Sequence, residues 1–400
     1  MYKTYPQIVF PLIFVFSLTL CVKYVTIIRI FESYISNNNE ETIMLTNTKY
    51  KLTDNNSLRI AFFGGSITDG TGASDAENTS YRAIVTQWFK KQYPDAQIIT
   101  KNASIGGTGT SLGMFRCQKD ALSFEPDLIF MEYAVNDEGD TYENIALQTE
   151  SIIRTVIKHD PMTDIIAVIT TGEPMLKYMQ NGKEADSVTA QTDIANYYGI
   201  PLIKAGNSLL AQTAVTSLTM HDLIPDGLHP NDSGHKIYAE SVIKYIAKCL
   251  DNCSAKAVPH VLPDKLYGNA SDNARLVDIG NADDLVLNGF EFKNSIKDNR
   301  FNEYIEGTHP GDSFSFTFEG TRAAFYWMGG GVSCDVTVCI DGGEPFTARS
   351  WDHYVRSFHK MQAATFAKDL AFGTHTVKVT IPQNTSNSDI FARIAGIMIA

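Results

Sequence analysis

Short apolar runs alternate with longer amphipathic segments over the central part of the chain, from Leu58 to about Lys248. The apolar runs have the length and character of strands buried on both faces, and they cover residues 58–63, 97–100, 128–133, 165–169 and 201–203. Segments with a helical period and a polar face lie between them, at residues 81–93, 112–122, 142–158 and 187–198. The pattern predicts an α/β fold with a doubly wound parallel sheet, whose ligand site lies at the carboxyl ends of the strands.

The pattern changes after Cys253. Segments such as 313–318 and 376–381 alternate apolar and polar residues between glycine-rich turns, which is typical of half-buried antiparallel strands. We therefore expect a β-sandwich from about Val277 onward, joined to the α/β part by a connector at residues 255–272 that holds Pro259 and Pro263. The predicted organisation is an N-terminal segment at 1–39, an α/β domain at 58–250 and an all-β sandwich domain at 273–400.

The N-terminal segment differs from both domains. Residues 8–22 form an apolar run behind Lys3, and Lys23 is followed by a second apolar patch that ends at Phe31. The run predicts a targeting segment, and because no small-x-small cleavage site follows it, we favour an uncleaved signal anchor over a cleaved signal peptide. A mostly polar stretch up to Ser57 separates it from the α/β domain. We expect the protein to be anchored in a membrane with its catalytic domain outside the cytoplasm, or else secreted.

Composition and charge narrow the classes of partner. The chain has 400 residues, more than one core usually organises, and a net charge of -12, which repels phosphate backbones and argues against nucleic acid. Its six cysteines are too scattered for a disulfide scaffold and include no CxxC pair for zinc. Cys249 and Cys253 could pair where a helix frays, whereas Cys334 and Cys339 would face opposite sides of a strand. The redox state of the cysteines and the oligomeric state stay open.

A serine follows the first predicted strand directly, in the segment Gly64-Gly65-Ser66-Ile67-Thr68. This position puts Ser66 at the carboxyl edge of the sheet and makes it a candidate nucleophile. The alternative is a glycine-rich turn or a phosphate-binding loop that happens to contain a serine. The sequence has neither a Walker lysine nor GxGxxG here, which argues against a nucleotide site, and no GxSxG elbow of an ordinary α/β hydrolase.

A carboxylate and an imidazole lie three residues apart near the end of the α/β domain. At this spacing Asp226 can reach Nδ1 of His229 and leave Nε2 free to take a proton from a serine. Asp222 is a rival orienting carboxylate, but the chain between it and His229 would have to bend back. The alternative is an Asp/His turn that caps the final helix, and the presence of Ser66 favours the catalytic interpretation.

Two further segments close the second and third predicted strands, at residues 102–107 and 132–137. Gly107 offers an exposed backbone N–H and Asn136 a side-chain amide, and such donors stabilise the oxyanion of a tetrahedral intermediate. Either residue alone could simply end a strand in a turn. Together with the serine, the histidine and the aspartate, they form a catalytic constellation.

These four segments, in this order, resemble blocks I, II, III and V of the SGNH/GDSL-like hydrolase family over residues 58 to about 248. The resemblance implies a flavodoxin-like sheet and a Ser66 nucleophile. It also implies an Asp226 and His229 base unit, and an oxyanion hole made by the Ser66 N–H, Gly107 and Asn136.

Two positions depart from the family pattern. Gly65 stands where an aspartate usually precedes the serine, and Ala134-Val135 replace the glycine that commonly precedes Asn136. These departures resemble the carbohydrate-esterase-like branch rather than the classical lipases or thioesterases. The turns at 320–322, 340–343 and 373–377 resemble those of the jelly-roll modules that accompany such esterases.

The resemblance implies a serine esterase that hydrolyses small acyl esters, acetyl above all, on carbohydrate. Its partners are then an acylated carbohydrate or small ester and, through the N-terminal segment, a membrane; no metal and no organic cofactor is implied. One alternative is a lipid esterase or O-acyltransferase that uses the same residues. Another is a carbohydrate-binding surface protein with a silent hydrolase domain.

The second domain carries candidate sugar-binding aromatics. Trp351 and Tyr354 lie in a polar stretch and could stack on sugar rings, whereas Trp327 lies in an apolar run that predicts a core position. Because the mapped catalytic residues precede the connector, we expect the second domain to be dispensable for turnover of small esters. The competing expectation is that it packs over the catalytic mouth and forms part of the substrate wall. Asp137 is expected to matter less than Asn136, because the chemistry requires no second carboxylate there.

Overall fold

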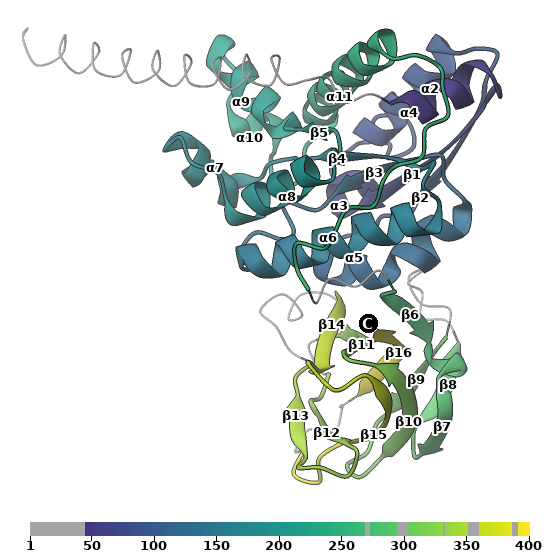
Figure 1. The fold of residues 1–400 in the computed structure, drawn as a ribbon. Helices are drawn as coiled ribbons and strands as arrows, with labels where there is room; N and C mark the ends of the chain where they lie inside the picture. Colours follow the sequence, from purple (N-terminus) through teal and green to yellow (C-terminus); the bar gives the residue numbers. More distant parts are fainter. Residues whose placement is uncertain (1–44, 269–272, 295–302, 331–332, 351–359, 386–390) are drawn as a thin grey trace, which may run out of the picture.

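The computed structural model describes residues 45–268, 273–294, 303–330, 333–350, 360–385 and 391–400. They form an α/β domain and an all-β domain that lie against each other (Figure 1). None of the helices in these ranges is long and apolar enough to span a membrane. The predicted anchor at residues 1–39 lies outside the described residues and stays a prediction.

A parallel sheet forms the centre of the α/β domain. Its strands are β1 (Ser57–Gly64), β2 (Gln97–Asn102), β3 (Leu128–Glu132), β4 (Asp164–Val168) and β5 (Leu202–Ile203). They lie in the order β2-β1-β3-β4-β5, so the chain changes direction across the sheet at β1. In doubly wound sheets this switch point is where ligands bind, outside the carboxyl ends of the strands. The predicted doubly wound α/β fold is confirmed, and each predicted strand coincides with one of these five.

Helices cover both faces of the sheet (Figure 1). One face carries α2 (Thr46–Thr53), α4 (Tyr81–Gln92), α9 (Ala205–Val215) and α11 (Asp232–Asn252), and the other carries α5 (Thr110–Arg116), α6 (Tyr142–His159) and α8 (Asp186–Tyr197). The shorter helices are α3 (Ser66–Asp69), α7 (Glu173–Gln180) and α10 (Met220–Leu223). Side-chain caps set the starts of the long helices. Thr141 accepts from the Asn144 N–H before α6, and Asn231 accepts from the Ser233 N–H before α11.

Two segments differ from the sequence prediction. The stretch before Ser57, which we interpreted as a polar separator, contains helix α2, and Leu45 and Leu52 at its two ends are buried. The helix predicted at 112–122 begins at Thr110 and ends at Arg116, where the chain continues as a π-helical turn (Cys117–Ala121) and a 3-10 turn (Leu122–Phe124). The hydrophobic pattern of the sequence did not predict helices α7, α9 and α10.

The cysteines that the structure describes are free thiols. Cys249 lies within α11, and the Cys253 thiol lies 3.6 Å from the carbonyl oxygen of Leu45. The disulfide considered between these two cysteines is therefore absent. Cys334 is buried and Cys339 half-exposed, and neither is paired.

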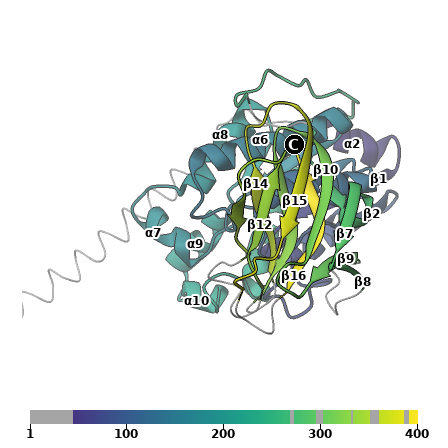
Figure 2. The ribbon, with the colours of Figure 1, turned by 90° about the horizontal axis from the view of Figure 1, so that it is seen from below.

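Two antiparallel sheets form the second domain. The first contains β13 (Phe346–Ala348), β12 (Val336–Ile340), β15 (Gly373–Thr380), β10 (Ser313–Gly320) and β7 (Asp283–Asn288), in that order. The second contains β14 (Lys360–Ala367), β11 (Ala323–Gly329), β16 (Ala392–Ile399), β9 (Glu303–Gly307) and β8 (Glu291–Asn294), with β6 (Arg275–Asp278) paired to β16. Figure 2 shows the first sheet lying over the second, with the α/β domain behind them. Phe314, Phe316 and Phe318, on the inward face of β10, fill the core between the sheets.

The two domains share a hydrophobic core. Helix α5 packs against β6 and β14, and the π-helical turn packs against β6. Leu112, Met114 and Phe115 therefore belong to the same buried cluster as Met328 and Met361 of the second domain. The interface is continuous with the core under the parallel sheet and is not a surface contact.

The connector is bound to the α/β domain by two buried carboxyl groups. An Asp164 oxygen at the start of β4 lies 2.9 Å from Nε2 of His260. Glu150 of α6 accepts hydrogen bonds from the backbone N–H groups of Leu266 and Tyr267, at 2.7 and 2.8 Å. The second domain is thus held by its connector as well as by the shared core.

Candidate functional site

Strand β1 delivers the candidate nucleophile to the carboxyl edge of the sheet. Ser66 is the first residue of α3 and is buried. The two preceding glycines are required by close contacts. A Cβ at Gly64 would lie 2.5 Å from the Glu132 carbonyl oxygen, and a Cβ at Gly65 would lie 1.9 Å from Oδ1 of Asn136. The departure from the family pattern at position 65 therefore has a steric reason, because a side chain there would displace Asn136.

A buried carboxyl group lies beneath this turn. Glu132, at the end of β3, accepts from the hydroxyl of Thr68 at 2.8 Å and from that of Thr170 at 2.7 Å. The Thr68 hydroxyl also lies 2.7 Å from the Tyr81 hydroxyl. Burial raises the pKa of Glu132 above its usual range, against the opposing effect of these hydrogen bonds. Glu132 therefore joins the turn after β1 to the residues that follow β4.

The predicted base unit reaches the serine. Nε2 of His229 lies 2.8 Å from Oγ of Ser66, and its Nδ1 lies 2.7 Å from Oδ2 of Asp226. The backbone N–H groups of Leu228 and His229 both donate to Oδ1 of Asp226, at 2.9 and 2.7 Å. Partial burial alone would raise the pKa of Asp226, but the hydrogen bonds from these N–H groups and from the imidazole outweigh it and lower the pKa.

The rival carboxylate has a different role. Asp222 accepts from the backbone N–H of Thr219 at 2.8 Å and from its hydroxyl at 2.6 Å, in the capping box of α10. Asp226 is thus the carboxylate that contacts the His229 ring.

A second histidine holds the loop that packs against His229. His235 accepts from the Tyr81 N–H at 3.3 Å, and its Nε2 lies 3.2 Å from the Thr71 carbonyl oxygen. Burial lowers the pKa of His235 to about 4, so its ring is neutral and donates from Nε2. The next residue, Gly72, has a φ of +91°, and a Cβ there would lie 3.1 Å from the Cβ of His229. Only glycine fits this position behind the imidazole.

The turns after β2 and β3 converge on the serine. A Cβ at Gly106 would lie 3.4 Å from the Cβ of Ser66, and Gly107 follows with a φ of +74°. Asn136 is half-buried, with its Oδ1 against Gly65. The structure therefore brings Ser66, Gly107 and Asn136 to one edge of the sheet, whereas their roles in oxyanion stabilisation stay a prediction.

Residues 62–237, which carry all of these turns, match the model of the GDSL-like lipase/acylhydrolase family. This part of the chain is therefore similar to the GDSL-like hydrolases, and we call it the GDSL-like domain. The model describes lipases and acylhydrolases, and this similarity supports an esterase.

Comparison with solved structures extends the likeness beyond the GDSL-like domain. A two-domain esterase (CEX) active on acetylated mannans is 23% identical, with 89% of this chain and 95% of that chain covered and a TM-score of 0.78. A GDSL-like lipase from Parabacteroides merdae and the acetylxylan esterase Axe2 from Geobacillus stearothermophilus match 48% and 47% of this chain. Their identities are 17% and 21% and their TM-scores 0.41 and 0.39. At these identities the matches bear on the fold, and the first shows that both domains share it. Among curated protein sequences, none matches this chain.

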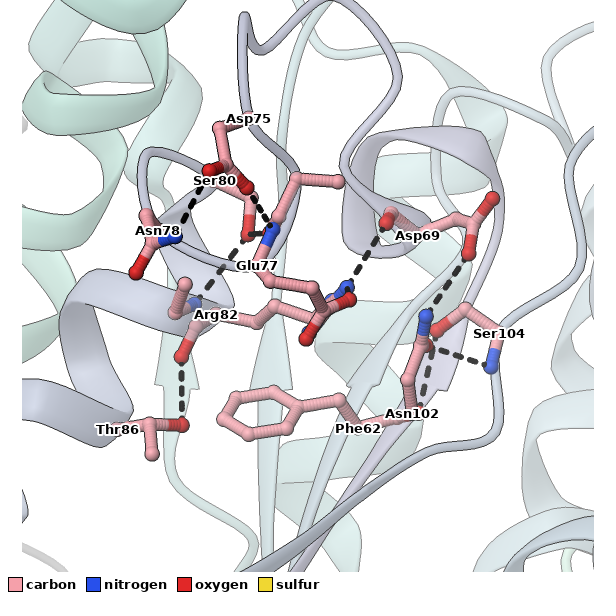
Figure 3. Close-up of polar contacts among 12 residues, drawn as sticks. Phe62, Asp69, Asp75, Glu77, Asn78, Ser80, Arg82, Thr86, Asn102 and Ser104 are labelled. Carbon is pink, nitrogen blue, oxygen red and sulfur yellow. Dashed lines mark hydrogen bonds and ion pairs between the residues drawn. The ribbon is translucent and has the colours of Figure 1, made fainter.

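A polar network ties the helical turn after Ser66 to its surroundings (Figure 3). Asn102, at the end of β2, donates to the Asp69 carboxylate at 2.8 Å and accepts from the Ser104 N–H at 3.1 Å. Arg82 of α4 donates to the Asp69 carbonyl oxygen at 3.3 Å and pairs with Glu77. The last residue of α3 is thus held by both neighbouring elements.

A cavity of about 330 Å³ lies between the GDSL-like domain and the second domain. Gly107 and the first turn of α5 line one side, and Trp327, Arg349 and Gln362 line the other. Trp327 is 1% exposed, which confirms the predicted core position, and its indole N–H has no hydrogen-bond partner among the described residues. The cavity therefore begins at the turn next to the serine and ends on groups of the second domain that can bind a polar ligand.

Sequence reasoning found the residues at the strand ends but missed those that support them. Glu132, Asp137 and His235 are buried polar residues whose partners lie far away in the sequence, so no local signal marks them. Trp351 and Tyr354, the predicted sugar-binding aromatics, lie outside the described residues. Within the described ranges, no group of three or more His, Cys, Asp or Glu residues is arranged to hold a metal ion.

Proposed function

We propose that the protein is a serine esterase that hydrolyses small acyl esters, acetyl first among them, on carbohydrate. The observation that carries the proposal is the pair of short contacts from His229, 2.8 Å to Ser66 and 2.7 Å to Asp226. A neutral imidazole held at Nδ1 by a carboxylate can take a serine proton at Nε2.

Acylation begins when Oγ of Ser66 attacks the ester carbonyl carbon and its proton passes to Nε2 of His229. The carbonyl oxygen becomes an oxyanion, which accepts from the N–H groups of Ser66 and Gly107 and from the side-chain amide of Asn136. Collapse of this intermediate breaks the ester C–O bond, and the departing sugar hydroxyl takes the proton back from His229. The acyl group is left on Ser66.

Deacylation repeats the steps with water. His229 takes a proton from the water, the water oxygen attacks the acyl carbon, and Ser66 leaves with that proton while the acid is released. Asp226 stays ionised throughout, because its pKa is lowered, and it stabilises the imidazolium formed in each half-reaction.

The carbohydrate part of the proposal is supported by the cavity. Its volume of about 330 Å³ lies at the lower end of ligand pockets, which suits one or two sugar residues. The side chains of Arg349 and Gln362, which line it, offer polar groups for sugar hydroxyls. The matched two-domain esterase acts on acetylated mannans, so acetylated mannan is the first polymer to test.

The test has two arms. Fluorophosphonate should label the wild-type protein and not Ser66→Ala, because only an activated serine reacts. The rate of acetate release from p-nitrophenyl acetate and from acetylated manno-oligosaccharides should exceed the rate at which longer acyl esters release their acids. Arg349→Met, which removes the guanidinium from the cavity lining, should raise KM for the oligosaccharide and leave turnover of the small ester unchanged. Absence of labelling would favour a silent hydrolase domain, and a preference for long acyl chains would favour a lipid esterase.

We further propose that residues 1–39 tether the enzyme to a membrane with both domains outside the cytoplasm. The support is the apolar run at 8–22 and its flanking lysines. Fractionation of cells that produce the full chain tests this, since the enzyme should stay with the membranes in high salt and leave them only in detergent.

A further inference from the structure

The two predicted oxyanion donors outside Ser66 lie on separate turns. Gly107 follows β2 and Asn136 follows β3, so their distance depends on how the two turns are joined. Donors to a developing oxyanion work only when they are already in place, because reorganisation during the reaction would cost part of the stabilisation. A contact between these turns therefore bears on catalysis.

The turn that carries Gly107 is held at both ends. At its start, the Ile105 N–H donates to the Gly64 carbonyl oxygen at 3.1 Å, which ties it to β1. At its end, the Thr110 N–H donates to Oδ1 of Asp137 at 2.8 Å. A Cβ at Gly109 would lie 2.2 Å from the same oxygen, so the Asp137 carboxyl rests directly on the backbone of this turn.

The Asp137 carboxyl is itself held in a buried network. Its Oδ2 accepts from the side-chain amide of Gln191 at 2.8 Å and lies 3.0 Å from the Thr110 hydroxyl. That hydroxyl lies 2.8 Å from Oε1 of Gln148. Asp137 is 5% exposed, and burial raises its pKa to about 7 against the hydrogen bonds that lower it. With a proton on Oδ2, the carboxyl can donate to Thr110 while Thr110 donates to Gln148, so every group keeps a partner.

Asp137 directly follows Asn136, and both backbone N–H groups donate to the Tyr133 carbonyl oxygen, at 2.9 Å from Asn136 and 3.0 Å from Asp137. Asp137, which binds the Gly107 turn, thus belongs to the same tight turn as Asn136, the predicted amide donor. We propose that Asp137 is a positioning residue that fixes the Gly107 turn relative to Asn136 and so preorganises the oxyanion hole. The inference rests on the proposed function of this site, and it assigns Asp137 a larger part than the sequence predicted.

The test compares Asp137→Ala with Asp137→Asn in the full-length protein. Alanine removes the contact to the Thr110 N–H, so kcat for p-nitrophenyl acetate should fall roughly 10- to 100-fold, less than for loss of a donor itself, with KM within about threefold. Asparagine keeps the Oδ1 acceptor and places an amide where the protonated carboxyl can donate, so it should recover most of kcat. Affinity for a short alkylboronic acid, which forms a tetrahedral adduct with the serine, should fall in parallel with kcat.

Glu150→Gln is the matched control, because Glu150 is an equally buried carboxyl of the same domain that binds the connector instead. It should leave kcat and the boronic acid affinity unchanged. Wild-type turnover that Ser66→Ala abolishes tests the proposed function separately. Given that turnover, folded Asp137→Ala with kcat within twofold of wild type, or with unchanged boronic acid affinity, would overturn the positioning role alone. If alanine prevents folding, Asp137→Ser repeats the test, and failure of both to fold would make the role purely structural and overturn the inference.

Discussion

Removal of the second domain measures how far the two domains depend on a shared core. A chain that ends at Cys253 loses the connector and the β domain, whereas a chain that ends at Gly268 keeps the described part of the connector. We expect both to be less stable than the full chain, and the shorter one to be the less stable of the two. From the sequence we expected the second domain to be dispensable for turnover of small esters, with packing over the catalytic mouth as the competing expectation.

The apolar part of the loss comes from helix α5. Leu112, Met114 and Phe115 are at most 4% exposed, in a cluster that includes Met328 and Met361 of the β domain. Exposing side chains of this size costs about 1.5 to 3 kcal/mol each, or roughly 5 to 9 kcal/mol for three. Domains are stabilised by only about 5 to 15 kcal/mol in total, so the loss is comparable with the whole stability.

The connector adds a polar part. Without it, Glu150 loses the N–H groups of Leu266 and Tyr267, and Asp164 loses His260. Both carboxyl groups keep other partners, so each lost hydrogen bond costs about 0.5 to 1.5 kcal/mol, which sets the scale of the difference between the two truncations.

Urea unfolding followed by fluorescence gives the measurement, because Trp88 is the tryptophan retained by both truncated chains. Full-length Val286→Ser is the control, since Val286 is 61% exposed on β7 and should not alter the midpoint. Turnover of p-nitrophenyl acetate is measured on the same samples. A truncated chain within about 1 kcal/mol of the full-length stability and with unchanged kcat/KM would refute the shared-core reasoning.

Three further predictions concern catalysis, pH and anchoring. Asn136→Ala should lower kcat by about 10² to 10³ with little change in KM, and an effect confined to KM in steady-state assays would contradict an oxyanion role. The pKa of His235 is lowered to about 4 in the folded protein, so between about pH 6.5 and 4 the unfolded chain binds a proton that the folded chain does not. The stability this group contributes is present above that window and is lost as the pH falls through it. His235→Gln should therefore flatten the decline of unfolding free energy between pH 7 and 4.5, and an unchanged decline would refute the assignment. Deletion of residues 1–39 should release an active enzyme, because α2 starts only at Thr46, and activity left in the membrane fraction would count against the anchor.

The parallel sheet could be predicted because its strands are buried on both faces, which leaves continuous apolar runs such as 128–133. Helix α2 could not, because its sequence is mostly polar. Its buried residues Asn47 and Thr48 are held by the Asp164 carboxylate, more than a hundred residues away, and no local pattern records such a contact. The sequence also predicted that antiparallel strands follow Cys253, but not that they complete the core around α5.

In the candidate site, too, some residues could be predicted from the sequence and others could not. Ser66, Asp226 and His229 could be selected because the chemistry limits the residue types and the strand ends limit the positions. The contacts of Asp137 and the cavity between the domains could not be predicted. The surroundings of Asp137 depend on how the turn after β2 meets the turn after β3, and the cavity exists only because the β domain docks on α5.

The cavity between the domains has a consequence for how such proteins diversify. Accessory modules are often exchanged between enzymes during evolution without disturbing the catalytic partner. Here the module carries Trp327 and Arg349, while the catalytic part carries Gly107, and all three line one cavity. Replacing the module would change the shape of that cavity and open the core at the same time. Lineages of this architecture should therefore inherit their two halves together, and chimeras that join halves from distant lineages should need compensating substitutions along α5 and β14.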